Sequence, residues 1–134
     1  MLQEHGYNGF QVRGQRLFVR PIESGDAEAI GAFLDANGSP GETPAWGLLA
    51  KLVGDLAGVM SMKIADDGLY VENVVVAREL RRKRIGRFLL DEAARLAEKI
   101  DRDRLVVVDP RDAGEFLRRT GFTEEDGVLV RRVR

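Results

Sequence analysis

The sequence contains no cysteine and one histidine, His5. Disulfide bridges, thiolate metal sites and cysteine nucleophiles are therefore excluded, and one histidine near the N-terminus argues against a Ser-His-Asp triad or a multi-histidine metal site. No apolar run approaches the about 18 residues of a membrane span, and the first residues lack the basic and apolar regions of a signal peptide. We expect a cytoplasmic protein with no metal site and no membrane contact.

The composition is that of a globular protein. Of the 134 residues, 44% are hydrophobic and 32% are charged, which argues against disorder. Because domains average about 150 residues, we expect a single domain over residues 1–134, with a loosely ordered segment at 1–9.

The formal charge of −1 hides one strongly basic segment. Residues 78–87 contain six basic side chains and a single acidic one. Concentrated positive charge in a nearly neutral chain favours a compact anionic ligand, whereas nucleic-acid-binding proteins more often have an extended basic face.

Apolar periodicity predicts alternating strands and helices. Residues 10–20 form two short extended runs about Gly14, and 17–22 is the clearer expected strand. The other expected strands cover 46–53, 56–64, 69–76, 105–108, 122–123 and 128–133, and the expected helices cover 27–36, 84–100 and 112–121. Asp26 is the expected cap of the first helix. Strand 69–76, helix 84–100 and strand 105–108 form a βαβ unit, which favours a right-handed, parallel connection. We expect a mixed α/β sheet of about six to seven strands, with helices on both faces.

The loop at 77–86 is the expected ligand site, because ligands favour the point where the first strand of a βαβ unit meets the helix N-terminus. That helix end carries free amides and a partial charge of about +0.5. The arginines there repel one another unless an anion neutralises them. Gly86 in the first helical turn costs stability and permits close approach to the backbone. The pattern predicts a phosphate or pyrophosphate site, and a solvated basic turn is the alternative.

Glu72 and Asn73 interrupt the apolar strand 69–76. Burial would raise the pKa of the Glu72 carboxyl group, as a general base near neutral pH requires. A structural ion pair with an arginine, or a position at a solvated end of the sheet, is the alternative. Strand alternation sends Glu72 and Asn73 to opposite faces and puts Tyr70 on the Glu72 face, where packing is its alternative role.

Two segments resemble the GNAT acetyltransferase superfamily. Residues 76–90 resemble its acetyl-CoA signature, Arg/Gln-x-x-Gly-x-Gly/Ala after a valine-rich strand, with Arg81 and Gly86 at the first and last positions. Residues 113–122 resemble its later motif, Ala-x-x-Phe-Tyr followed by Gly-Phe. The order of the elements also matches from Leu17 to the end of the chain.

The resemblance implies transfer of an acetyl group from acetyl-CoA to a primary amine of a small molecule, a peptide N-terminus or a lysine. It implies that Glu72 is the general base, and we take Asn73 and Tyr70 as candidate acceptor-binding residues. The implied cofactor-binding residues are Val74, Val75, Val76, Arg81, Arg82, Lys83, Arg84, Ile85, Gly86 and Arg87.

Two departures leave alternatives open. Arg84 replaces the middle glycine of the signature, and Leu117 stands where the family often has a tyrosine that protonates the leaving thiolate. A degenerate module that binds CoA or acetyl-CoA without turnover is therefore the alternative function. A domain that binds a nucleotide or RNA through the basic loop would need exposed aromatic residues beside it, which 78–87 lacks, so we expect no nucleic-acid partner. A monomer and a homodimer both remain open.

Overall fold

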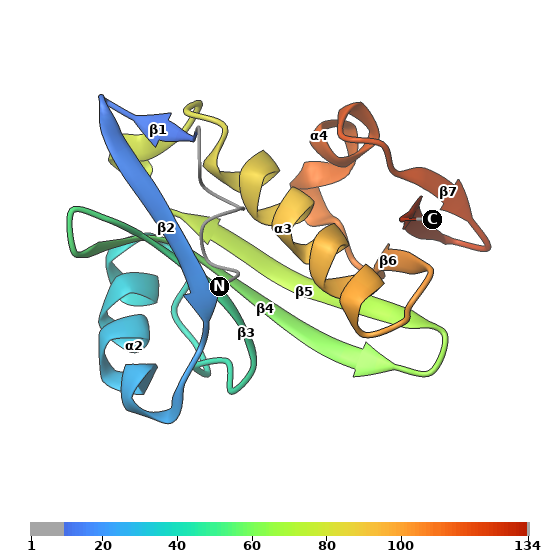
Figure 1. Ribbon diagram of the computed structural model, residues 1–134, viewed down its shortest axis with the longest axis horizontal. Helices are drawn as coiled ribbons and strands as arrows, with labels where there is room; N and C mark the ends of the chain where they lie inside the picture. The colour runs from blue at the N-terminus through green and yellow to red at the C-terminus, as the bar shows by residue number, and fades with distance from the viewer. Residues whose placement is uncertain (1–9, 134) are drawn as a thin grey trace.

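The structure is a computed structural model, and it describes residues 10–133. These residues form one eight-stranded mixed sheet with three α-helices and three 3₁₀ turns (Figure 1). The strands are β1 (Gln11–Val12), β2 (Gln15–Pro21), β3 (Gly47–Leu52), β4 (Asp55–Ala65), β5 (Gly68–Val76), β6 (Arg104–Val107), β7 (Thr123–Glu125) and β8 (Val128–Arg132). The helices are α2 (Ala27–Ala36), α3 (Ile85–Lys99) and α4 (Gly114–Arg119), and the 3₁₀ turns are η1 (Ser24–Asp26), η2 (Arg78–Leu80) and η3 (Arg111–Ala113).

The strand order is β1-β2-β3-β4-β5-β6-β8-β7, and β5 and β6 are the parallel pair. Helix α3 connects them, so the predicted βαβ unit and mixed sheet are confirmed. The sheet has eight strands, slightly more than the expected six to seven, and the short run before Gly14 pairs with β2 as Gln11–Val12. The turn between them holds Arg13 and Gly14 at φ of 54° and 78°. Two consecutive positive φ values are typical of a two-residue hairpin turn.

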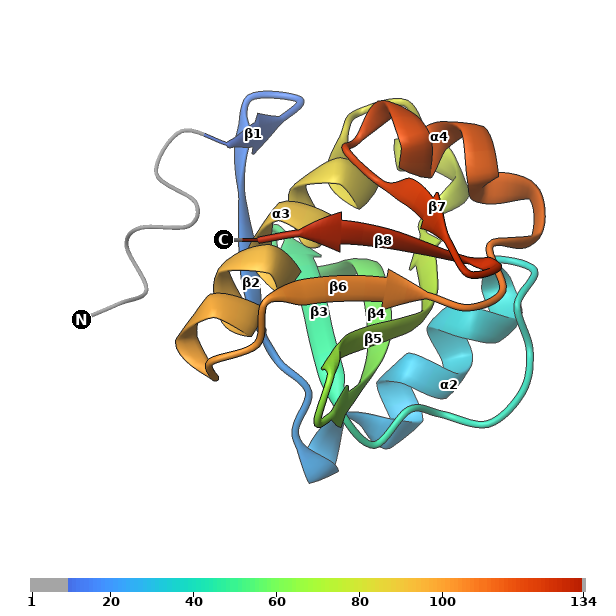
Figure 2. The same cartoon turned by 90° about the vertical axis from the view of Figure 1, so that its right-hand side faces the viewer.

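Helices cover both faces of the sheet, as predicted, with α2 and α3 on opposite sides (Figure 2). Neighbouring residues of β4 show the division. A Cβ atom on Gly58 would lie 3.1 Å from Leu89 and 3.4 Å from Ile85, both of α3. Val59, the next residue, lines a cavity together with Leu34 of α2. Alternation along β4 therefore places one residue against each helix layer.

Strands β5 and β6 separate soon after they pair. Their parallel register contains two pairs, Leu69 with Leu105 and Tyr70 with Val106. Strand β5 continues for six residues beyond Tyr70 while β6 ends at Val107. Within residues 10–133, the β6-facing edge of 71–76 therefore has no strand partner, and a wedge opens between the two strands.

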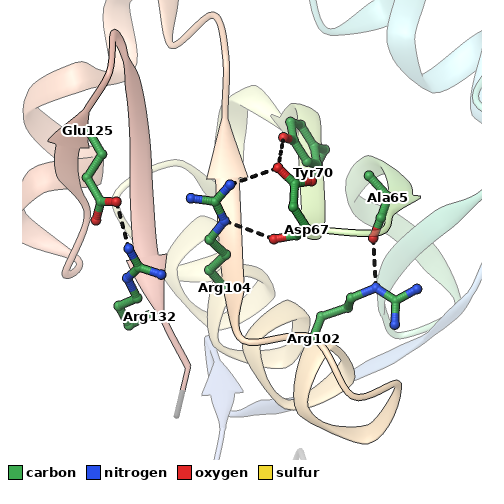
Figure 3. A network of polar contacts seen from close by, with 7 residues as sticks. All are labelled: Ala65, Asp67, Tyr70, Arg102, Arg104, Glu125 and Arg132. Atoms are coloured by element: carbon green, nitrogen blue, oxygen red, sulfur yellow. Dashed lines mark hydrogen bonds and ion pairs between the residues drawn. The ribbon is translucent and has the colours of Figure 1, made fainter.

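A polar network closes the narrow end of this wedge (Figure 3). The Asp67 carboxylate accepts hydrogen bonds of 3.0 Å from the Tyr70 hydroxyl and 2.8 Å from Arg104, whose Nε also donates to the Asp67 carbonyl at 2.9 Å. The Tyr70 hydroxyl, and then Arg104, hold the pKa of Asp67 below its usual range, and Asp67 raises the pKa of Tyr70. The β4–β5 turn is thus tied to β6 where the two strands meet.

A bulge interrupts the pairing of β4 with β5. Ser61 pairs with Asn73 and Met62 pairs with Val71, so Glu72 is an extra residue on β5. An extra residue bends its strand and shifts the alternation of side chains beyond it. The only ionisable residue of β5 besides Tyr70 therefore lies at its one irregular position.

Asp26 precedes α2, as expected, but its carboxylate caps no amide of that helix. It accepts two hydrogen bonds of 2.8 Å from the Arg20 guanidinium and one of 2.7 Å from the Glu23 backbone amide. Arg20 and this amide hold the pKa of Asp26 well below its usual range. The pair joins the end of β2 to the beginning of α2.

We expect Asp26→Asn to lower the midpoint of thermal unfolding at pH 7, because it removes this charge-assisted pair. A carboxylate whose pKa is depressed by folding stabilises the protein above its unfolded pKa of about 3.9, and this stabilisation is lost as pH falls through the folded value. The difference in midpoint between the two proteins should narrow progressively below about pH 4. Asp35→Asn, exposed on the same helix, is the control; a constant difference across pH would contradict the assignment.

Candidate active site

The wedge between β5 and β6 forms a cavity of about 1060 Å³. One wall is β5 from Val71 to Val76, and the opposite wall is formed by 107–113 and by α4. The loop after β5 and the first turn of α3 close the wide end. We call this cavity the cofactor cleft. It lies where the sequence predicts the ligand of the βαβ unit.

The wide end of the cofactor cleft presents unpaired backbone amides. The first bond of α3 runs from the Phe88 amide to the Arg84 carbonyl at 2.9 Å. Within residues 10–133, the backbone amides of 82–87 donate to no protein acceptor. A helix N-terminus with free amides and a partial positive charge suits a phosphate group.

Two arginines shape the loop that leads into α3. Arg82 and Arg84 have φ values of 65° and 67°, in the left-handed region that favours glycine. Arg84 is the N-cap of α3, yet its side chain makes no capping hydrogen bond. The position where the signature has glycine thus has a backbone conformation that favours glycine.

Gly86 lies between the two walls of the cofactor cleft. A Cβ atom placed on it would lie 3.6 Å from Cζ of Phe116 on α4 and 3.9 Å from Cγ2 of Val76 on β5. These are ordinary van der Waals distances, so the fold accepts a Cβ atom here. The absent side chain instead leaves the amides of the first helical turn accessible from the cleft.

Positive charge concentrates along the cofactor cleft. The arginines that line it are Arg81, Arg82, Arg84, Arg87, Arg111 and Arg119. Of the predicted cofactor-binding residues only Lys83 does not line the cleft; Val74, Val75, Val76, Ile85 and Gly86 do. Arg81 is folded back, with its Nε 3.3 Å from the Val76 carbonyl. Arg119, on α4, was missed because it lies 32 residues beyond Arg87 in the sequence.

Asn37, which the sequence did not single out, holds the turn η2 that precedes the loop 81–84. The Asn37 side chain ends α2 by donating to the Phe33 carbonyl at 2.8 Å, and its oxygen accepts the Arg78 amide, also at 2.8 Å. Arg13 donates to the Glu79 carbonyl at 2.9 Å. The turn η2, from which the loop 81–84 continues, is therefore fixed to both α2 and the β1–β2 turn.

A second cavity of about 580 Å³ adjoins the cofactor cleft. Its outer wall is the loop 39–45, which the sequence identifies as rich in glycine and proline, and its floor includes Val59 and Ser61 of β4. We call it the acceptor cavity. The residues that line both cavities are Ser39, Glu72, Asn73, Val75 and Arg111.

Glu72 lies at this junction, although not in the predicted environment. The expected burial of Glu72 is wrong, because its side chain is exposed. Alternation is expected to send Glu72 and Asn73 to opposite faces, yet both residues line the same two cavities. The bulge accounts for this, because it adds a residue to β5 at Glu72. The Asn73 side chain lies 3.4 Å from the Ser39 hydroxyl, across the mouth of the acceptor cavity.

The structure does not bring Tyr70 to this site. Tyr70 bonds to Asp67 at the narrow end of the wedge (Figure 3) and lines neither cavity. Leu117 is buried and lines the cofactor cleft. No tyrosine within residues 10–133 lines either cavity, so this part of the chain supplies no phenol as an acid there.

The described residues carry little that favours other classes of site. No helix of 10–133 has the length and apolar character needed to cross a membrane. Over the same range, no three acidic or histidine side chains gather as metal ligands would.

The site consists of two adjoining cavities, one of them lined with arginines. The sequence model of the acetyltransferase (GNAT) family matches residues 15–122. The chain therefore belongs to the GNAT family. The predicted family, a GNAT acetyltransferase, is thereby confirmed.

Solved structures agree on the fold. The GNAT family N-acetyltransferase YhbS from Escherichia coli, in complex with CoA, has a TM-score of 0.73 at 18% identity, covering 92% of this chain and 85% of that one. The ribosomal-protein-S18-alanine N-acetyltransferase from Escherichia coli has 0.70 at 16% identity, covering 87% and 94%. N-acetylglutamate synthase from Neisseria gonorrhoeae, complexed with coenzyme A and N-acetyl-glutamate, has 0.71 at 18% identity, covering 88% of this chain.

The present chain spans 35% of the N-acetylglutamate synthase chain. A sequence search of curated proteins gave no match. At these identities the structural likeness establishes the fold, and the acceptor and the roles of individual residues rest on the geometry of the site.

We expect Gly86→Asp to remove CoA binding and preserve the fold. A Cβ atom at this position makes only ordinary contacts in the free protein, and a carboxylate in the first turn of a helix is favourable. The same carboxylate occupies the amides and repels phosphate, which should lower affinity by at least about tenfold.

The measurement is thermal unfolding with and without CoA. A ligand at 100 times its dissociation constant stabilises by about 2.7 kcal/mol, which raises the midpoint by several degrees. Gly25→Asp adds the same charge at an open position in η1 and should retain the CoA shift. If CoA raised the unfolding midpoint of Gly86→Asp as much as that of the native protein, the loop before α3 would not be part of the cofactor site.

We expect Arg84→Gly to raise the free energy of unfolding by about 1 kcal/mol, because glycine adopts the left-handed conformation without the cost an arginine incurs. The matched control is Arg87→Gly, three residues away in the helical first turn, which should lower it by about 1 kcal/mol. Urea denaturation measures both. Equal destabilisation by the two changes would mean that the conformation of Arg84 is stabilised by its side chain.

Proposed function

We propose that this protein transfers the acetyl group of acetyl-CoA to a primary amine bound in the acceptor cavity, with Glu72 as the general base. The observation that carries the proposal is the position of Glu72 at the junction of two cavities, one of them lined with arginines and unpaired amides. A carboxylate at that point is within reach of both substrates of an acyl transfer.

The cofactor cleft fits CoA in its two chemically distinct parts. The amides of 82–87 and the arginines around them would hold the pyrophosphate. The edge of β5 at 74–76 has no strand partner and offers backbone groups to the amide-containing pantetheine arm, as one strand does to another. The arm would displace Arg81 from the Val76 carbonyl to use that group. Bound acetyl-CoA supplies an acetyl group activated as a thioester.

Glu72 would accept a proton from the acceptor. Amines are protonated near neutral pH, and an ammonium group carries no free electron pair for attack on a carbonyl carbon. The exposed carboxylate, directly or through a water molecule, takes this proton before the attack. The neutral amine would then bond to the acetyl carbon as the C–S bond of the thioester breaks, and the second proton of the nitrogen would pass to water or to the departing thiolate. Asn73, beside it, would orient the amine across the opening toward Ser39.

No described side chain at the cleft replaces the acid that tyrosine provides in many relatives. Leu117 carries no proton to donate. A thiol has a pKa of about 8.5, so its anion leaves readily near neutral pH, and water can protonate it. Leu117 also favours the second candidate function, a module that binds CoA without turnover. That module would bind acetyl-CoA and release no CoA thiol with any amine.

We expect Glu72→Gln to lower kcat by about 100-fold or more at pH 7, within the range for loss of a general base. The loss should shrink at high pH, where more of the acceptor is already the neutral amine. Affinity for CoA, measured by thermal unfolding, should not change. The rate is measured as CoA thiol released from acetyl-CoA over a panel of primary amines.

Glu98→Gln, which removes one exposed carboxylate from α3 away from both cavities, is the control and should retain full activity. An unchanged rate in Glu72→Gln would make Glu72 a structural residue. Thiol release by neither protein with any amine, together with an intact CoA shift, would favour the non-catalytic module.

A further inference from the structure

The acceptor cavity carries charge of the opposite sign to the cofactor cleft. Six arginines line the cofactor cleft. Among the described residues that line the acceptor cavity and not the cleft, Glu42 is the one ionisable side chain. Glu72, at the junction, adds a second carboxylate. Within residues 10–133, the part of the acceptor cavity that is not shared with the cleft therefore carries net negative charge, which would attract a cationic ligand.

Glu42 has a fixed place in the cavity wall. The loop that carries it begins with the Ser39 amide, which donates to the Leu34 carbonyl at 2.9 Å. It continues across α2, where Cγ2 of Thr43 lies 3.4 Å from the position of a Cβ on Gly31. Contacts on both sides of Glu42 thus hold the loop against α2, and Glu42 lines the acceptor cavity but not the cofactor cleft.

The basic residue of the acceptor cavity belongs to the cofactor side. Arg111 lines both cavities and approaches Asp109 at 3.9 Å, so part of its charge is already balanced. The backbone amide of Arg111 also donates a hydrogen bond to the Asp109 carboxylate at 3.3 Å. An acceptor that places its reacting amine at Glu72 and extends away from the cleft meets Glu42 rather than Arg111.

We propose that the acceptor is a small amine with a second cationic group, a di- or polyamine in chemical class, whose distal charge is recognised by Glu42. This inference rests on the proposed function, because it takes Glu72 to mark the reacting end. The volume of about 580 Å³ suits a small molecule. A carboxylate at the distal end of the acceptor would face Glu42 and be repelled.

Three amines of equal length test the sign of the recognised group. They are 1,4-diaminobutane, 1-aminobutane and 4-aminobutyrate, whose distal groups are cationic, neutral and anionic. Each is assayed as an acceptor with acetyl-CoA and is also titrated calorimetrically into CoA-saturated protein, which reports binding without turnover. We expect kcat/KM and affinity to fall about fivefold from the diamine to the monoamine, as for one exposed ion pair, and further for the amino acid.

Two variants connect the preference to Glu42. Glu42→Gln should remove the advantage of the diamine over the monoamine, and Glu42→Lys should favour 4-aminobutyrate. Glu28→Lys makes the same charge change on an exposed part of α2 outside both cavities and should leave the order as in the native protein.

The outcomes separate this inference from the proposed function. Preference for the neutral or anionic amine, binding of none of the three, or an order that Glu42→Lys leaves unchanged would overturn the acceptor class. Binding in the expected order without acetylation would support the acceptor class and overturn the transfer reaction. If CoA itself does not bind, the proposed function fails, and titration of the amines into the CoA-free protein decides whether Glu42 recognises the distal cation.

Discussion

The short parallel pairing between β5 and β6 is the constraint on which the rest of this structure depends. Two residue pairs join the strands, and the network of Asp67, Tyr70 and Arg104 ties them at that end. Because α3 must connect the strands, its N-terminus lies where they are farthest apart. The free amides of the helix and the open edge of β5 therefore border one cavity, and neither would be accessible in a fully paired sheet.

The bulge in β5 lies where the wedge meets the acceptor cavity. Without the extra residue, regular alternation would send Glu72 and Asn73 to opposite faces of the sheet. The irregular register instead lets both line the place where the cofactor cleft meets the acceptor cavity. The bulge therefore places a carboxylate, Glu72, and an amide, Asn73, where the two cavities meet. Neither residue belongs to the hydrophobic core of the sheet.

Local patterns predicted the elements and the cofactor side of the site. The apolar run 69–76, the amphipathic spacing of α3 and Gly86 in its first turn are short-range signals, and all lead to the wedge. The bulge could not be predicted, since it depends on the register of β5 against β4. The bond from Tyr70 to the Asp67–Arg104 pair, the contact of Asn37 with Arg78 and the packing of loop 39–45 join distant segments. These contacts decide where Tyr70 and Glu42 lie.

The arginine-rich loop also makes the protein sensitive to its ionic surroundings. Most of these side chains are exposed, and mobile ions screen charges of this kind over about 8 Å at physiological ionic strength. Rising salt would weaken the attraction for a polyphosphate ligand and relieve the mutual repulsion of the empty loop. Salt therefore destabilises the complex and stabilises the free protein. The fraction of clefts that hold ligand then depends on ionic strength as well as on ligand concentration.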